Sequence, residues 1–495
     1  WLKPILVACR PTGPLEWPPA AQAMRQPGCS SDNEGSNEEF GDILFRDHGW
    51  CSCILMVSGL STCITVDILQ YSMPLAFLPS VLEDRGHSSM KIATAIGVYY
   101  WTGFAGGLMI TCYQVFRLLR DCVPVKEVTT LTETRQKIQY LIVALGIGGV
   151  SLVGQALYPR CWTHTVCRFV QGLAGAFIFF YTFLLCVAIF KGSQQVFAMT
   201  AASTALNIAE VLGSSFGALL FERGGQRAVF WVLGLVSFVN QILLVVILSH
   251  LKAGYPSVNS SLRATPQLTP RRSPRSGYPR LMGVLQSPRL CCAVILIVMA
   301  AVVKGSVEEM LPFHADHRWG FSPMHIGQLF SIVAVGYIVS AVMCGRIWVR
   351  LQGFQIAFSA FWLAVLGGMA WCVFITTAYC KHETVLWAGL LTYGLCLGLT
   401  HTPAALLLAD TIEHEEGRAK DAVNGIWNTM WEAGGSLGFL LGGLLAEHYG
   451  GQLKLLSGYA VCCIVSAGAM LAIAPREKRL KAMLDYGSST PPSRA

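Results

Sequence analysis

Apolar runs long enough to cross a lipid bilayer, about 20 residues each, recur along most of this 495-residue chain. At about 1.5 Å of rise per residue, a helix of that length matches the roughly 30 Å hydrocarbon core. A spanning barrel would need segments of about ten residues with alternating polarity, whereas these runs are continuous and rich in Gly, Ala and Leu. Only 13% of the residues are charged, about half the share usual in soluble proteins. The sequence therefore predicts an all-α membrane protein.

The hydropathy pattern predicts about twelve transmembrane helices. We place them near residues 51–79, 91–116, 138–157, 162–190, 196–221, 228–250, 290–313, 325–350, 353–377, 383–409, 421–449 and 453–474. With both termini in the cytosol, 26 of the 36 Lys and Arg residues lie on the cytosolic side, 7 on the opposite side and 3 within spans. The positive-inside rule therefore favours cytosolic termini and an even number of spans. Both the plasma membrane and an internal vesicle or vacuole membrane fit this pattern.

The longest polar interruption divides the chain into two predicted bundles of six helices. It covers residues 251–289 and contains seven Lys or Arg residues and no Asp or Glu, a composition that cannot bury a core. We therefore predict a cytosolic linker between a bundle at 50–250 and a bundle at 290–475. An acidic, disordered cytosolic tail is expected at 1–49, and a second cytosolic tail at 476–495.

An internal repeat relates the two predicted bundles. At an offset of 234 residues, Gly86–Ile92 matches Gly320–Ile326 at the entry to the second span of each half. At an offset of 225 residues, the fifth span matches the eleventh at Gly213, Gly217, Leu219, Leu220, Glu222 and Gly225. The repeat indicates two pseudo-symmetric bundles with the same topology.

Several functional classes are excluded by the same pattern. The net charge of +8 reflects basic cytosolic loops, so a nucleic-acid partner is not expected. No nucleophile, metal or phosphate-binding set occurs in the context that an integral-membrane enzyme requires, so we predict neither an enzyme nor a cofactor. His314, Asp316 and His317 resemble a metal cluster, but we place them in a solvated loop after Pro312 and predict no metal site.

The fourth span opens with the string CRFVQGLAGA, which contains Arg168 and Gly175. This string resembles the fourth-helix signature of the proton-antiporter branch of the major facilitator superfamily. An arginine inside an apolar run is unfavourable unless it faces a polar cavity or a carboxylate. Arg168 is therefore a candidate site residue.

The fifth span, EVLGSSFGALLFERGG, resembles the antiporter motif of the same superfamily. Gly213 and Gly217 form a GxxxG pair that allows a neighbouring helix to approach closely. Gly438 and Gly442 are their equivalents in the eleventh span. Ser214 replaces the proline of the motif, which leaves the mode of coupling open.

In the first helix of each half, one carboxylate precedes a proline. Asp67 lies twelve residues before Pro79, and Glu308 lies four residues before Pro312. This arrangement is similar to that of the vesicular amine and polyamine transporter group, and the resemblance covers most of residues 60–470. Because a charge at that depth costs about 2.5–3.5 kcal/mol on insertion scales, both residues are functional candidates.

The resemblance implies a major facilitator fold of two six-helix bundles, in which a single protein molecule transports a small-molecule solute by alternating access. Removal from water disfavours the charged form of a carboxyl group, which lets it exchange protons near neutral pH. We expect Asp67 and Glu308 to bind a proton or a cationic solute, and Arg168 to tune them. The further cavity candidates are His401, Glu432 and Glu210.

Two alternative functions remain open at this stage. In a carrier of anionic or neutral metabolites, Arg168 or Lys304 would hold the solute. In a non-transporting sensor, the fold would persist without coupling. The loop after the second span reads QVFRLLRDCVP and lacks the usual gating motif of the superfamily, which favours the sensor. His401 and Asn428 stand where amine carriers tend to have acidic residues, which argues against a monoamine in particular.

Overall fold

The computed structural model describes residues 49–120, 131–190, 192–253, 287–351, 353–380, 382–412, 418–446 and 449–488. These residues are almost entirely helical, and none of them forms a strand. Residues Cys53–Ala495 fold as one unit. Almost all of the predicted N-terminal tail, most of the predicted linker and the end of the predicted C-terminal tail lie outside the described residues.

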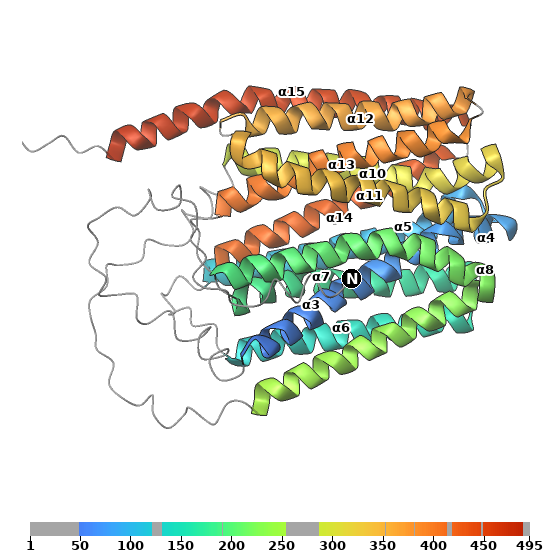
Figure 1. The fold of residues 1–495 in the computed structure, drawn as a ribbon, viewed down its shortest axis with the longest axis horizontal. Coiled ribbons are helices and arrows are strands. Elements are labelled where there is room, and N and C mark those ends of the chain that lie inside the picture. The colour runs from blue at the N-terminus through green and yellow to red at the C-terminus, as the bar shows by residue number, and fades with distance from the viewer. Residues whose placement is uncertain are drawn as a thin grey trace, which may run out of the picture. The chain divides into compact units, whose positions relative to one another are not determined.

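Long helices lie side by side along a common direction (Figure 1). They are α3 (Gly49–Ser72), α5 (Ser89–Arg120), α6 (Leu131–Leu157), α7 (Cys161–Ile189), α8 (Gly192–Ala253), α10 (Pro288–Trp319), α11 (Pro323–Trp348), α12 (Gln355–Tyr379), α13 (Glu383–Ile412), α14 (Arg418–Ala446) and α15 (Tyr449–Ser488).

Nine of the described helices are long and apolar enough to cross a membrane. Two more long helices, α5 and α14, fall outside that set, and α14 carries Asn428 and Glu432 within its apolar run. Helix α8 counts once among the nine but bends at Gly225, whose φ of 69° and ψ of −178° are not helical. Counting α5, α14 and both arms of α8 gives the twelve passes expected from the sequence. The prediction of an all-α membrane protein is confirmed.

The first span is broken where the sequence suggested a continuous helix. After α3 ends at Ser72, a 3-10 turn η2 (Met73–Ala76) leads into the short helix α4 (Leu78–Asp84). Proline has no N–H to donate and fits the first turn of a helix, so Pro74 and Pro79 favour two new helix starts over continuation. The break places the last turn of α3 beside the buried charges described below.

Unlike the first span, helix α10 is not broken at its proline and continues through Pro312 to Trp319. The expected end of this span near residue 313 is therefore wrong, and so is the expected solvated loop. His314 is buried, and its Nε2 atom lies 2.9 Å from Oγ1 of Thr377 on α12. Packing against α12 thus extends a helix that the proline alone was expected to end.

The sequence repeat reappears as a repeated turn. Gly86 and Gly320 both adopt left-handed backbone angles, with φ of 77° and 64°, a region that glycine enters without steric strain. The N–H of Gly86 donates to the carbonyl oxygen of Glu83, and that of Gly320 to Asp316, both at 2.7 Å. The two turns therefore introduce α5 and α11 in the same way.

Helices from the two sequence halves pack directly against each other. Helix α5 contacts α14, and α8 contacts α11. Within the C-terminal half, α10 packs against α13 and α14. The charged residues that the sequence places inside the membrane lie where these helices meet.

Candidate functional site

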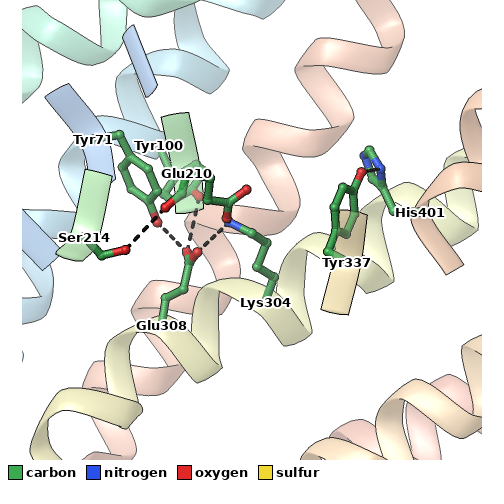
Figure 2. A network of polar contacts seen from close by, with 8 residues as sticks. All are labelled: Tyr71, Tyr100, Glu210, Ser214, Lys304, Glu308, Tyr337 and His401. Carbon is green, nitrogen blue, oxygen red and sulfur yellow. Dashed lines mark hydrogen bonds and ion pairs between the residues drawn. The ribbon is translucent and has the colours of Figure 1, made fainter. Parts of the chain in front are cut away.

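A buried lysine on α10 lies at the centre of a polar cluster. Lys304 and Glu308 are four residues apart, so they project from one face of the helix and form an ion pair. The Nζ atom of Lys304 also lies 2.9 Å from Oε1 of Glu210 on α8. Tyr71 on α3 donates a hydrogen bond to Glu308, and the hydroxyl of Tyr100 on α5 lies 3.5 Å from the same carboxylate. Figure 2 shows these side chains converging on Glu308 and Lys304.

A small pocket lies beside this cluster. Its wall includes Ser72 and Ser214, together with the apolar or aromatic side chains of Phe330 and Tyr393. The cavity volume is about 20 Å³, little more than one water molecule needs. An organic solute therefore requires the surrounding helices to separate before it can enter.

Asp67 lies in a second cluster, formed by α3, α5 and α7. The residue is 4% exposed, and its Oδ1 accepts a hydrogen bond of 3.0 Å from Tyr99. Arg168 is fully buried on α7; it donates to the carbonyl oxygen of Gln70 at 3.0 Å, and its guanidinium carbon lies 5.9 Å from the Tyr99 ring centroid. A Cβ atom at Gly175 would lie 2.8 Å from Oδ1 of Asp67, so this glycine makes room for the carboxylate. Tyr99 thus contacts both charged side chains.

His401 on α13 connects to the lysine cluster through aromatic rings. Its Nδ1 atom lies 2.6 Å from the hydroxyl of Tyr337 on α11, and its ring centroid is 4.8 Å from that of Trp431 on α14. The Trp431 ring centroid in turn lies 5.8 Å from Nζ of Lys304. His401 therefore lies one aromatic side chain away from the charged cluster. Figure 2 shows His401 beside Tyr337.

Two other carboxyl groups inside the membrane have buried oxygen atoms without a hydrogen-bond partner among the described residues. One is Glu432, whose Oε2 would lie 2.7 Å from a Cβ atom added at Gly103 on α5. The other is Glu309, which is 1% exposed and packs against Gly442 on α14. Glu309 was not predicted as a site residue, although two adjacent acidic residues in an apolar helix are a visible signal in the sequence.

The predicted packing glycines lie where the fifth helix of each half crosses the first. On α8, a Cβ atom at Gly217 would lie 2.4 Å from the carbonyl oxygen of Met73 in η2. On α14, a Cβ atom at Gly438 would lie 2.4 Å from the carbonyl oxygen of Val302 on α10. In each half, the fifth helix thus packs on the first. The other two predicted positions lie nearest to side-chain atoms; they are Gly213 and Gly442.

In the described part of the chain, no group of three or more His, Cys, Asp or Glu residues is placed to hold a metal ion.

The structure gathers Glu210 and Glu308 around Lys304 and joins Asp67 to Arg168 through Tyr99. His401 is linked to the first group through Trp431.

Membrane-spanning helices arranged around buried charges and a closed pocket define the chain as a multi-pass membrane transporter. Residues 131–424, more than half of the chain, match the model of the Major Facilitator Superfamily. The chain belongs to this family, whose members are transporters rather than enzymes. The predicted fold and the resemblance on which it was based are confirmed.

Curated relatives are similar over most of the chain. The mouse MFS-type transporter SLC18B1 is 22% identical over 469 residues, which cover 88% of this chain and 90% of the relative. The mouse vesicular acetylcholine transporter is 22% identical over 324 residues, which cover 65% of this chain and 57% of the relative.

Solved structures show the same fold. A bacterial homologue of the human lysosomal transporter Spinster, in an inward-facing and unoccupied conformation, aligns with a TM-score of 0.59 at 10% identity. The alignment covers 87% of this chain and 98% of that one. Its occupied inward-facing form aligns with a TM-score of 0.58.

Proposed function

We propose that this chain is a proton-coupled antiporter of a small organic cation, which binds between the two helical bundles and is exposed to each side of the membrane in turn. Membership of the Major Facilitator Superfamily supports the transport of a solute. One relative is named for acetylcholine, which is an organic cation. Because identity to that relative is low, the choice of a cation rests on the chemistry of the buried site.

The observation that carries the proposal is an excess of carboxyl groups over cationic groups in the two clusters and the helix contacts around them. In that part of the described chain the cations are Lys304 and Arg168, whereas the carboxyl residues are the buried Asp67, Glu308 and Glu309 and the half-buried Glu210 and Glu432. An uncompensated charge in a bilayer costs about 2.5–3.5 kcal/mol on insertion scales. The surplus carboxyl groups therefore need protons or a cationic solute, and exchanging one for the other is antiport.

In this proposal, one cluster binds the solute and the other binds the coupling proton. Glu308 and Glu210 lie on the small pocket, so they are placed to bind the cationic solute. Among the described residues Asp67 contacts a tyrosine hydroxyl and has no ion pair, whereas Glu308 pairs with Lys304, so Asp67 is the stronger candidate for the coupling proton. Arg168 lies against the same tyrosine ring and tunes the charge of the cluster.

Contacts between the predicted halves are arranged to allow alternating access. Ser215 on α8 lies 2.8 Å from Ser331 on α11, and Thr111 on α5 lies 3.1 Å from Thr429 on α14. The first contact joins the fifth helix of the N-terminal half to the second helix of the C-terminal half. The other contact joins the second helix of the N-terminal half to the fifth helix of the C-terminal half. Opening the pocket to one side requires one of the two contacts to separate while the other holds.

The proposal is tested by flux in proteoliposomes with an imposed pH gradient. We expect a pH gradient to drive accumulation of a radiolabelled amine such as 1,4-diaminobutane or choline, and a protonophore to abolish it. Citrate and glucose serve as anionic and neutral probes. Gradient-driven uptake of citrate or glucose with no uptake of any amine would reject the proposal in favour of a metabolite carrier. No flux of any probe in a correctly folded preparation would favour a sensor.

A further inference from the structure

Lys304 is held in an unusual way for a lysine inside a membrane helix. It is 9% exposed, and its ammonium contacts two carboxylates, that of Glu210 at 2.9 Å and that of Glu308 one turn away. One of these carboxylates lies on the same helix and the other on α8, in the opposite half of the sequence. Two acids around one base leave a net negative charge even when the lysine is present.

Aromatic rings complete the surroundings of the same nitrogen. The Nζ atom of Lys304 lies 5.7 Å from the ring centroid of Tyr71 and 5.8 Å from that of Trp431. Carboxylates combined with aromatic faces within about 6 Å are the groups that proteins use to bind ammonium ions. Four helices, α3, α8, α10 and α14, therefore supply an ammonium-binding site, and a side chain of the protein occupies it.

The space around the nitrogen does not admit an organic amine while the lysine is in place. The adjoining cavity has a volume of about 20 Å³, enough for about one water molecule. Lysine carries its charge on a flexible four-carbon stem, so it can withdraw while the carboxylates and rings stay in place. A solute amine and the lysine are therefore alternative occupants of one position.

We infer that Lys304 is a tethered occupant of an ammonium subsite formed by Glu210, Glu308, Tyr71 and Trp431, and that a protonated amine of the solute replaces it during transport. This inference rests on the proposed function and specifies how the cation is recognised. The subsite is filled by the protein itself when no solute is bound, so the two carboxylates keep one compensating positive charge while the carrier changes conformation.

A site in which Lys304 binds an anionic solute fits the geometry less well. Such a lysine would keep its ammonium accessible, whereas this one is already in contact with two carboxylates. An anion would have to displace both of them and then lie beside their negative charges. Replacement of the lysine by an amine avoids that repulsion.

Chemical rescue tests the inference directly. n-Butylamine has the four-carbon stem and ammonium of lysine, and Lys304→Ala removes all of the lysine side chain beyond Cβ. We expect n-butylamine to raise the thermal unfolding temperature of the Lys304→Ala protein and to bind it at least about ten-fold more tightly than the parent. The reason is that removing an internal competitor restores the fraction of sites that are open to an added ligand.

The controls separate this effect from general stabilisation. n-Butanol and butyrate have a similar size but no positive charge, and they should not rescue the variant. Lys454→Ala removes an exposed lysine, and n-butylamine should affect this variant no more than it affects the parent. Because Lys304→Ala leaves two carboxylates without a cation, the double variant Lys304→Ala with Glu210→Gln is measured as well.

Absence of n-butylamine rescue in both the single and the double variant would overturn the inference, as would equal rescue by butyrate. These outcomes are distinct from failure of the proposed function. Proton-driven amine flux without rescue would reject only the subsite, and rescue without amine flux would reject only the antiport.

Discussion

The two charged clusters differ in how their carboxylates are compensated. Glu308 contacts a lysine and accepts a hydrogen bond from Tyr71, whereas Asp67 accepts one hydrogen bond from Tyr99. Arg168 contacts the ring of the same Tyr99 but donates its hydrogen bond to a backbone carbonyl. A carboxylate that already has a cation can exchange it for another cation, and one without a cation needs a proton to become neutral. We therefore assign solute binding to the first cluster and proton coupling to the second.

The largest expected effect follows from removing the charge at Asp67. Asp67→Asn keeps the shape of the side chain but removes its titratable proton. We expect this variant to lose pH-driven accumulation entirely while it still exchanges the amine across vesicles without a gradient. Glu308→Gln should instead weaken amine binding by about ten- to a hundred-fold, as expected for the loss of a charged contact of about 1.5–3 kcal/mol.

Flux with and without a pH gradient, together with equilibrium binding, measures both effects. Asp84→Asn is a suitable control because this carboxylate is exposed at the end of α4. Full coupled flux in the Asp67→Asn protein would move the proton site to Glu309, Glu432 or the lysine cluster. Equal loss of exchange in both variants would show that the two clusters act as one site.

The sequence predicted the fold well because the relevant signals are local. Apolar runs determine where helices cross the membrane, and the Gly86 and Gly320 repeat marks the same turn in both halves. The predicted end of α10 was wrong because His314 packs against Thr377, which is distant in sequence, and the chain stays helical beyond Pro312. Long-range packing of this kind leaves no local pattern.

The candidate site was predicted only in part. Asp67, Arg168 and Glu308 stood out because charged residues are unfavourable in an apolar helix. Contact between Lys304 and Glu210 depends on how α8 and α10 meet, and no spacing in the sequence encodes it. The tyrosines and Trp431 were missed because aromatic side chains are common in membrane helices and gain a role only beside a charge.

A second, smaller effect tests how closely the fifth helix packs on the first in each half. Gly217→Ala and Gly438→Ala each place a methyl group 2.4 Å from a backbone oxygen of a neighbouring element. Because backbone atoms cannot rotate away, we expect each substitution to destabilise the protein by about 1–3 kcal/mol. The unfolding temperature, followed by intrinsic fluorescence in detergent, should fall by a similar amount in both.

Gly368→Ala provides the matched control, because no atom lies within 4 Å of the added Cβ at this helical glycine of α12. Its unfolding temperature should not fall. A loss of stability at only one of Gly217 and Gly438 would show that the close approach to a backbone oxygen matters in one half and not in the other.

The smallest effect concerns the edge of the lysine cluster. Tyr337→Phe removes the hydroxyl that lies 2.6 Å from Nδ1 of His401, and a neutral hydrogen bond contributes about 0.5–1.5 kcal/mol. Since ring contacts link His401 to Lys304 through Trp431 in the described part of the chain, we expect amine affinity to fall by less than about ten-fold, well below the effect of Glu308→Gln. Equilibrium binding of the transported amine measures it, with Tyr140→Phe, at an exposed tyrosine of α6, as the control. A loss as large as that of Glu308→Gln would place His401 inside the cation site itself and extend that cluster across α13.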